Sequence, residues 1–246
     1  MTGRKHLPYL FTVLISLSQM ACTTNHFVSA GKTATIERTV DSIYSIKMLD
    51  RINVEIIQDT INRLYLTGPE NYLSKVNTTY SKGQITIEDN NSYGWYTGYD
   101  VTITVTVHVT HLKQIYYEGI GNISSLNTLV TDSLRVISEK SSGDINLDIN
   151  ANYFYCYFNQ SAADVSVTGT APRIHLQING TGFIRCSELI SSHCWVHNQG
   201  SGDIHAYASS SISGIIEGVG NVFYTGNPSY TSLVVKGRGI GKFIEY

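Results

Sequence analysis

The chain has 246 residues, with 17 Lys and Arg against 19 Asp and Glu and a formal net charge of −2. This near-neutral balance argues against a nucleic-acid-binding protein, which usually carries a basic patch or stripe. Charged residues make up only 15% of the chain and apolar residues 42%. This composition favours a packed, turn-rich, exported all-β protein and excludes wholesale disorder.

The first residues predict export. Arg4 and Lys5 precede an apolar run from Leu7 to Leu17. This run is too short to span a bilayer, which takes about 20 apolar residues. It fits the apolar region of a secretory signal peptide that covers residues 1–21.

The end of the signal peptide resembles the lipobox of bacterial lipoproteins, in which a Cys is lipidated after cleavage. Ala21 precedes Cys22 as in that motif, whereas the two residues before Ala21 depart from it. We expect Cys22 to hold the chain on the outer membrane through its acyl chains and residues 22–42 to form a tether. Ordinary cleavage near Ala21, leaving a free Cys, is the alternative.

Residues 43–118 show an apolar period of two. The segment Val101–Val109 alternates apolar and polar residues over nine positions. Strict alternation places one set of side chains on each face of a strand, so that one face can be buried and the other solvated. We therefore expect a strand-rich lead-in over these residues, as part of one domain that covers residues 43–246.

From residue 119 to residue 246 the chain repeats a five-residue corner of the form small-x-small-polar-apolar, as in the segment 200–204. The fourth positions of seven such corners are residues 122, 144, 164, 183, 203, 221 and 242. Self-similarity at a regular interval of about 20 residues indicates a solenoid or array. The corner residues are Gly121, Asn122, Gly143, Asp144, Asp164, Gly182, Gly202, Asp203, Gly220, Asn221 and Gly241.

The length of the repeat predicts a parallel β-solenoid. About 20 residues at about 3.3 Å each give a path of about 65 Å, enough for one turn of a flattened or triangular coil. Stacked coils then bury their apolar side chains against equivalent positions of their neighbours. We expect the corner glycines to adopt positive φ and the following Asn or Asp to bond the turn backbone.

These corners resemble a bacterial envelope family, the putative auto-transporter adhesin, head GIN domain family, common in Bacteroidetes. The resemblance covers residues 43–246 and also rests on the segment Tyr224–Pro228 and the glycine-rich stretch Lys236–Lys242. It implies a β-solenoid-like domain in the cell envelope with an adhesin role, and it implies no catalytic residues. Ala162 and Ala163 replace the glycines of one corner, and Phe183 replaces Asn or Asp in another.

Two patterns could suggest metal binding. A column of Asn and Asp at the fourth corner position could bind Ca²⁺, but nonapeptide Ca²⁺ repeats are half as long and Phe183 interrupts the column. His193, Cys194 and His197 lie close in sequence, but on a strand the two His face one way and the Cys the other. We expect neither a metal site nor a cofactor.

Aromatic residues gather in two segments. Tyr93, Trp95, Tyr96 and Tyr99 lie between turn signals and could stack on sugar rings; alternatively they form a hairpin tip that caps the solenoid. The segment Tyr153–Phe158 is expected to be a strand with one aromatic set inside and the other outside. The remaining cysteines, Cys156, Cys186 and Cys194, are expected to be small buried hydrophobes.

The sequence favours a non-enzymatic binding or adhesion module of the cell envelope. Its partner would be a glycan or an envelope or matrix protein. A structural envelope component without a small ligand is one alternative. A β-helix enzyme that cleaves acidic polysaccharides is the other, but Arg173 and Arg185 do not obviously converge with acids.

Overall fold

The computed structural model describes residues 31–92 and 101–246. The expected signal peptide and Cys22 lie outside these residues, as do Tyr93, Trp95, Tyr96 and Tyr99. Within the described ranges the chain is almost entirely β-structure, with one short helix, α2 (Glu70–Leu73). No helix in these ranges is long and apolar enough to cross a membrane.

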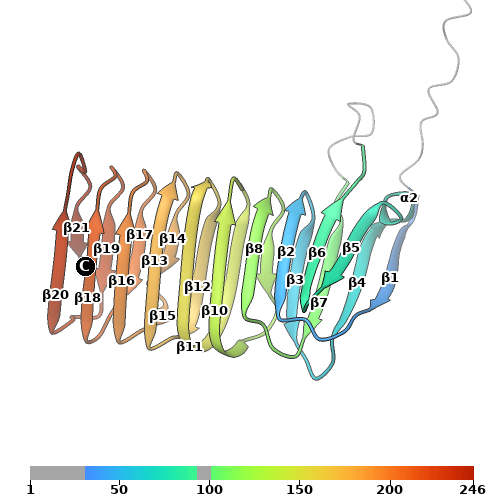
Figure 1. Ribbon diagram of the computed structural model, residues 1–246, viewed down its shortest axis with the longest axis horizontal. Helices are drawn as coiled ribbons and strands as arrows, with labels where there is room; N and C mark the ends of the chain where they lie inside the picture. Colours follow the sequence, from blue (N-terminus) through green and yellow to red (C-terminus); the bar gives the residue numbers. More distant parts are fainter. Residues whose placement is uncertain (1–30, 93–100) are drawn as a thin grey trace, which may run out of the picture. The chain divides into compact units, whose positions relative to one another are not determined.

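The strands form two faces that enclose the core (Figure 1). The first face contains, in stacking order, β5 (Val76–Ser81), β6 (Gln84–Asp89), β2 (Ser45–Asp50), β8 (Gln114–Gly119), β10 (Leu129–Glu139), β11 (Asp144–Ser161), β13 (Arg173–Gly180), β16 (His193–Asn198), β18 (Ser211–Ile216) and β20 (Tyr230–Val235). The second face contains β1 (Thr33–Thr39), β4 (Arg63–Pro69), β7 (Thr104–Val109), β3 (Asn53–Gln58), β9 (Ile123–Ser125), the first part of β11, β12 (Asp164–Thr170), β14 (Ile184–Cys186) with β15 (Leu189–Ile190), β17 (Ile204–Tyr207), β19 (Val222–Thr225) and β21 (Phe243–Glu245).

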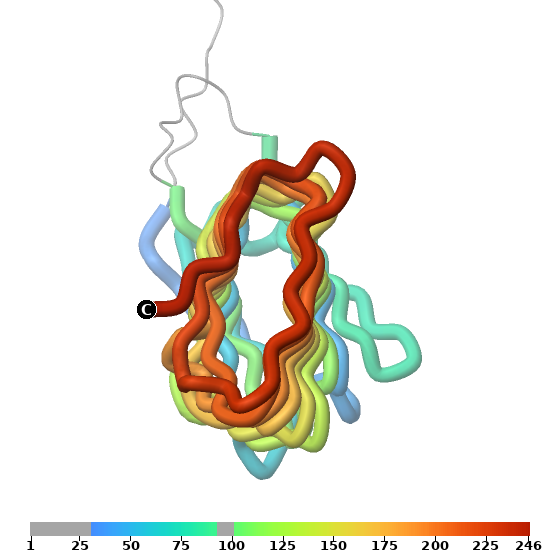
Figure 2. Tube along the Cα trace, turned by 90° about the vertical axis from the view of Figure 1, so that its left-hand side faces the viewer, coloured from blue at the N-terminus to red at the C-terminus, as the bar shows by residue number. Residues whose placement is uncertain are grey.

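Each coil runs along the first face, turns at a corner, and returns along the second face. Figure 2 looks along the stack and shows these coils superposed as flattened loops with two long sides. Strands of successive coils pair in parallel, and β10 and β11 are long enough to take part in both faces. The predicted parallel β-solenoid of coils of about 20 residues is confirmed.

The core follows from the alternation of each strand. In β11 the side chains of Phe154, Cys156 and Phe158 are fully buried, whereas Tyr153 and Tyr157 are only partly buried. The expected inward and outward aromatic sets are therefore confirmed. Cys156, Cys186 and Cys194 are buried and free, and burial raises the pKa of each thiol. A buried neutral thiol packs as a small hydrophobe, as expected.

The first coil of the sequence is not at the end of the stack. Strand β2 lies between β6 and β8, and β3 lies between β7 and β9, all in parallel register. The coil made by β6 and β7 thus stacks on the outer side of the coil made by β2 and β3. The lead-in over residues 43–118 therefore supplies coils to the same solenoid as the repeats.

Antiparallel strands cover the N-terminal end of this stack. Strand β5 pairs with β6 on the first face, and β4 pairs with β7 on the second. Strand β1 then pairs with β4 over residues 33–39. Strand β1 thus begins within the stretch 22–42 that the sequence suggests as a tether. Such strands protect the edges of the parallel sheets from pairing with other chains.

Candidate functional site

Glycines at the third position of the corners stack in one column. A Cβ added to Gly202 would lie 1.7 Å from the carbonyl oxygen of Gly182, and one added to Gly182 would lie 1.8 Å from that of Ala163. The corresponding distances are 2.0 Å for Gly121, 2.3 Å for Gly143, 2.0 Å for Gly220 and 2.1 Å for Gly241. Glycine is needed here because the backbones of successive coils touch.

Positive φ does not explain these corner glycines, contrary to the expectation from the sequence. Among the described glycines, positive φ occurs at Gly31, Gly83, Gly169, Gly226 and Gly237. None of these belongs to the column. The glycines of the corner motif are therefore required by the close approach between coils and not by an unusual backbone conformation.

Asn and Asp at the fourth corner position connect one coil to the next. Asp203 Oδ1 accepts the backbone N–H of Asn221 at 2.7 Å, and Asn221 Oδ1 accepts that of Lys242 at 3.0 Å. Equivalent bonds run from the Asp144 N–H to Asn122 and from the Phe183 N–H to Asp164, each at 3.0 Å. The side chains were expected to bond their own turn, but they bond the following coil and so help to fix its register.

Metal-binding geometry is absent from the described ranges, where no group of three or more His, Cys, Asp or Glu could hold a metal ion. On β16, His193 and His197 point outward while Cys194 is buried, as expected from the alternation. His193 bonds Ser211 at 2.8 Å and His197 bonds Glu217 at 3.0 Å. Each His therefore has a separate partner on the neighbouring strand or just beyond it.

The clearest candidate site is a row of outward side chains on the first face. Arg135 on β10 pairs in register with Tyr155 on β11, then His175 on β13, then Trp195 on β16. The Arg135 guanidinium carbon lies 5.2 Å from the centre of the Tyr155 ring. Ring centres of Tyr155 and His175 are 4.9 Å apart, and those of His175 and Trp195 are 4.1 Å apart. We call Tyr155, His175 and Trp195 the aromatic row.

The aromatic row is continuous because the strands of a sheet lie about 4.8 Å apart, within the range at which rings pack on each other. Its rings are half-buried, so each offers part of its surface to solvent. Tyr157 and His197 broaden it, with ring centres 6.5 Å from Tyr155 and 5.6 Å from Trp195. The rings are inclined to one another, by 64° between Tyr155 and His175 and by 54° between His175 and Trp195. Such a row of rings with polar atoms can hold a ligand that is itself partly apolar and partly polar.

His175 is the group of the row whose protonation is most constrained. Its Nε2 atom is buried without a hydrogen-bond partner, and burial lowers the pKa of His175. Burial likewise lowers the pKa of His205 on the second face and raises the pKa of Tyr155. The aromatic row is therefore neutral at pH 7.

We expect the protein to lose stability between pH 7.5 and pH 5.5. The unfolded chain binds a proton at each His with a pKa of about 6.5, whereas the folded chain resists protonation at His175 and His205, so acid favours unfolding. The carboxylates with lowered pKa, Asp59 and Glu217, contribute only at lower pH, where the unfolded carboxyls protonate. Thermal melting at the two pH values measures this loss.

The variant His175→Phe should show a smaller pH-dependent drop in melting temperature, because it keeps the ring and removes the titrating nitrogen. Gln177→Ala, a partly buried position on the same strand without a titrating group, is the control and should keep the full drop. An unchanged drop in His175→Phe would contradict the role of His175.

The aromatic row also has a signature in the sequence, which the alternation of apolar and polar residues does not reveal. Arg135, Tyr155, His175 and Trp195 follow each other at the interval of the repeat. Superposing the repeats outside the corner motif would have placed them in one column. The aromatic residues Tyr93, Trp95, Tyr96 and Tyr99, predicted as a binding segment, lie outside the described residues.

Comparison with known families identifies the relatives of this solenoid. The family model described as "Putative auto-transporter adhesin, head GIN domain" matches residues 44–228. The chain belongs to this family. Among curated proteins no relative matches the chain.

Solved structures share the head GIN fold. A "putative adhesin" from Bacteroides fragilis has 24% identity and a TM-score of 0.79, and the match covers 87% of this chain and 97% of that one. A "putative lipid binding protein" from Parabacteroides distasonis has 19% identity and a TM-score of 0.64 over 87% and 97% of the two chains. A "putative adhesin" from the same species has 17% identity and a TM-score of 0.65 over 89% and 98%. These likenesses establish the fold alone.

Proposed function

We propose that this head GIN protein is a non-enzymatic binding protein of the cell envelope whose first face holds an extended glycan. The aromatic row is the observation that carries this proposal. Tyr155, His175 and Trp195 present half-buried rings at the spacing of the strands, so a chain of sugar rings lying across the strands meets one ring after another. Location in the envelope is supported by the family name and by the expected signal peptide and lipid anchor at Cys22.

Two outward carboxylates near the row, Glu139 and Glu217, are engaged with neighbouring side chains. Glu217 accepts hydrogen bonds from Gln199 and His197, at 2.9 and 3.0 Å, and Glu139 accepts one from the Tyr116 hydroxyl. These bonds favour binding over acid–base cleavage, which needs a carboxyl group free to exchange a proton with the substrate.

A glycan array tests the proposal with the chain from residue 23 onward, because the described residues form one compact unit. Selective binding is expected, and Trp195→Ala should weaken it by about 30-fold, the effect of losing an aromatic hot spot of about 2 kcal/mol. Circular dichroism verifies that the variant is folded.

Phe223→Ala is the matched control, because Phe223 is a half-buried ring on the second face, stacked on His205 at 4.7 Å. It should bind like the unmodified protein. If Trp95→Ala abolishes binding and Trp195→Ala does not, the site lies in the segment 93–99. An array without any binding would instead support a structural envelope role.

A further inference from the structure

The aromatic row continues into a second feature of the first face. The register that aligns Arg135 with Tyr155 also aligns it with Gln114 of β8, Ser45 of β2 and Gln84 of β6. From β6 to β16 the column is Gln84, Ser45, Gln114, Arg135, Tyr155, His175 and Trp195, and serines of β5, β18 and β20 continue it at both ends. The seven strands from β6 to β16, at about 4.8 Å each, span about 29 Å, the scale of an oligosaccharide and not of a single sugar.

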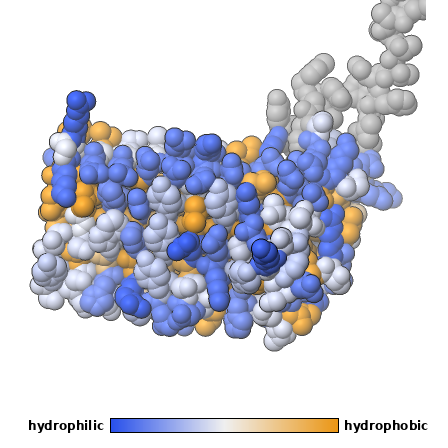
Figure 3. All heavy atoms as spheres, in the orientation of Figure 1, coloured by the Kyte–Doolittle hydropathy of each residue, from blue (hydrophilic) through white to orange (hydrophobic). Residues whose placement is uncertain are grey.

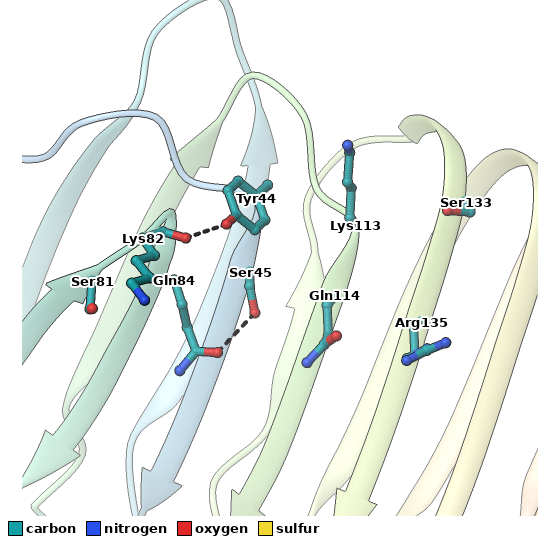
Figure 4. Close-up of a pocket in the computed structure, with 9 residues that line it drawn as sticks. All are labelled: Tyr44, Ser45, Ser81, Lys82, Gln84, Lys113, Gln114, Ser133 and Arg135. Atoms are coloured by element: carbon teal, nitrogen blue, oxygen red, sulfur yellow. Dashed lines mark hydrogen bonds between the residues drawn. The ribbon is translucent and has the colours of Figure 1, made fainter.

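A pocket of about 550 Å³ lies over the beginning of this column (Figure 4). Its lining residues are Tyr44, Ser45, Ser81, Lys82, Gln84, Lys113, Gln114, Ser133 and Arg135. Three of the nine are cations and none is a carboxylate. None of these three cations has a described carboxylate within 4.0 Å of its nitrogen atoms, and in Figure 4 they come from three separate segments around the neutral amides.

Local contacts order the Arg135 side chain and the backbone of Lys82 in this pocket. Lys82 is in the turn between β5 and β6, and its carbonyl accepts a hydrogen bond from the Tyr44 hydroxyl. Arg135 packs on the Tyr155 ring, and just beside the pocket Lys47 lies 4.9 Å from the centre of the Tyr116 ring. Such cation–π contacts keep a charged group ordered while its outer side stays available to an anion.

The pocket is positive in a chain whose net charge is −2. One carboxylate on its strands is close to the lining: Asp132 of β10 is next to Ser133, and its Oδ1 accepts a hydrogen bond from Asn152 at 2.7 Å. The others, Glu88, Glu118 and Glu139, each lie four residues further along their strands than Gln84, Gln114 and Arg135, a distance of about 13 Å. This is beyond the Debye length of about 8 Å at physiological salt, so these three carboxylates change the potential of the pocket little.

We infer that the glycan of the first face is anionic, with carboxylate or sulfate groups along its chain held by Lys82, Lys113 and Arg135 while neighbouring sugar rings lie on Tyr155, His175 and Trp195. This inference rests on the proposed function and names its ligand class. A single-stranded nucleic acid is a poorer match, because it needs cations along its whole length and here they are gathered at one end. The surface in the view of Figure 3 agrees with a polar ligand, since its apolar residues form separate areas among polar ones.

Chondroitin in three forms provides a matched set of probes: sulfated, unsulfated with its carboxylates, and carboxyl-reduced and therefore neutral. Titration calorimetry of oligosaccharides at low ionic strength should give affinity for the sulfated or the carboxylated form at least tenfold above that for the neutral form. The two charged forms distinguish sulfate from carboxylate recognition. Raising the salt should weaken the charged complexes and leave the neutral one nearly unchanged.

The double variant Lys113→Gln, Arg135→Gln should lose the preference for the charged forms, with a drop of about tenfold or more in their affinity. Arg185→Gln is the charge control, because Arg185 lies on the second face and pairs with Asp164 at 2.8 Å. It should keep the preference. Trp195→Ala should weaken all three forms, since it removes stacking and not charge.

Three results would overturn the inference in distinguishable ways. Equal binding of the neutral and charged forms, still weakened by Trp195→Ala, would leave the glycan function standing and refute its anionic class. Binding of none of the three forms, together with a blank glycan array, would refute both. Tighter binding of single-stranded oligothymidine than of any chondroitin would indicate that the ligand of this face is a nucleic acid and not a glycan.

Discussion

Replacing Gly202 by Ala should lower the free energy of unfolding by about 3 kcal/mol. The added methyl group would lie 1.7 Å from the carbonyl oxygen of Gly182, in a contact between two backbones. No rotamer can relieve such a clash, so the coils must separate locally, and overpacking of this kind costs about 1–3 kcal/mol or more. For a chain of this size the melting temperature should fall by roughly 6–12 °C.

Ser201→Ala is the matched control at the same corner, because Ser201 is exposed. It should change stability by less than about 0.5 kcal/mol. Urea denaturation followed by circular dichroism measures both variants. A Gly202→Ala protein as stable as Ser201→Ala would refute the explanation of the glycine column by close approach.

Replacing Phe154 by Ala should cost about 3–5 kcal/mol, the usual range for emptying a fully buried aromatic site. Phe154 lies on the inner side of β11, in register with Leu134 on β10 and Ile174 on β13. Because the neighbouring coils are fixed by their own hydrogen bonds, the cavity cannot collapse without disturbing both. The loss should appear in the urea midpoint and in the melting temperature.

Tyr153→Ala tests the opposite side of the same strand. Tyr153 points outward and is only partly buried, so its removal should cost less than about 1 kcal/mol. The ratio of the losses in free energy of unfolding caused by Phe154→Ala and Tyr153→Ala measures how completely the strand separates core from surface. Equal losses for Phe154→Ala and Tyr153→Ala would contradict the inward and outward assignment of β11.

Most of the fold could be predicted from local patterns in the sequence. Alternation in β7 and β11 fixes which side chains are buried, and the repeated corners fix the length of a coil, so the parallel solenoid could be predicted. The physical role of the corner glycines could not, because close approach depends on the carbonyl of the preceding coil. A contact between Gly202 and Gly182 has no signature within a single repeat.

The pairing of strands that are distant in the sequence could not be predicted, for the same reason. Nothing in β1 indicates that it joins β4, since its side chains are mostly exposed and β1 is itself an edge strand whose one partner among the described strands is β4. The aromatic row was missed although its members recur at the repeat interval. Ring chemistry at Tyr155, His175 and Trp195 is not identical from coil to coil, so the column is visible only when the coils are stacked.

The position of the first coil inside the stack shapes how the chain folds. Most coils of the repeat region join a neighbour about 20 residues away, but the Asn122 N–H bonds an Asn53 side chain 69 residues earlier. Closing the longer loop costs about 1 kcal/mol more conformational entropy. We therefore expect folding to nucleate in the regular C-terminal repeats, and the N-terminal strands to close the stack afterwards, as the slower step of distant contacts.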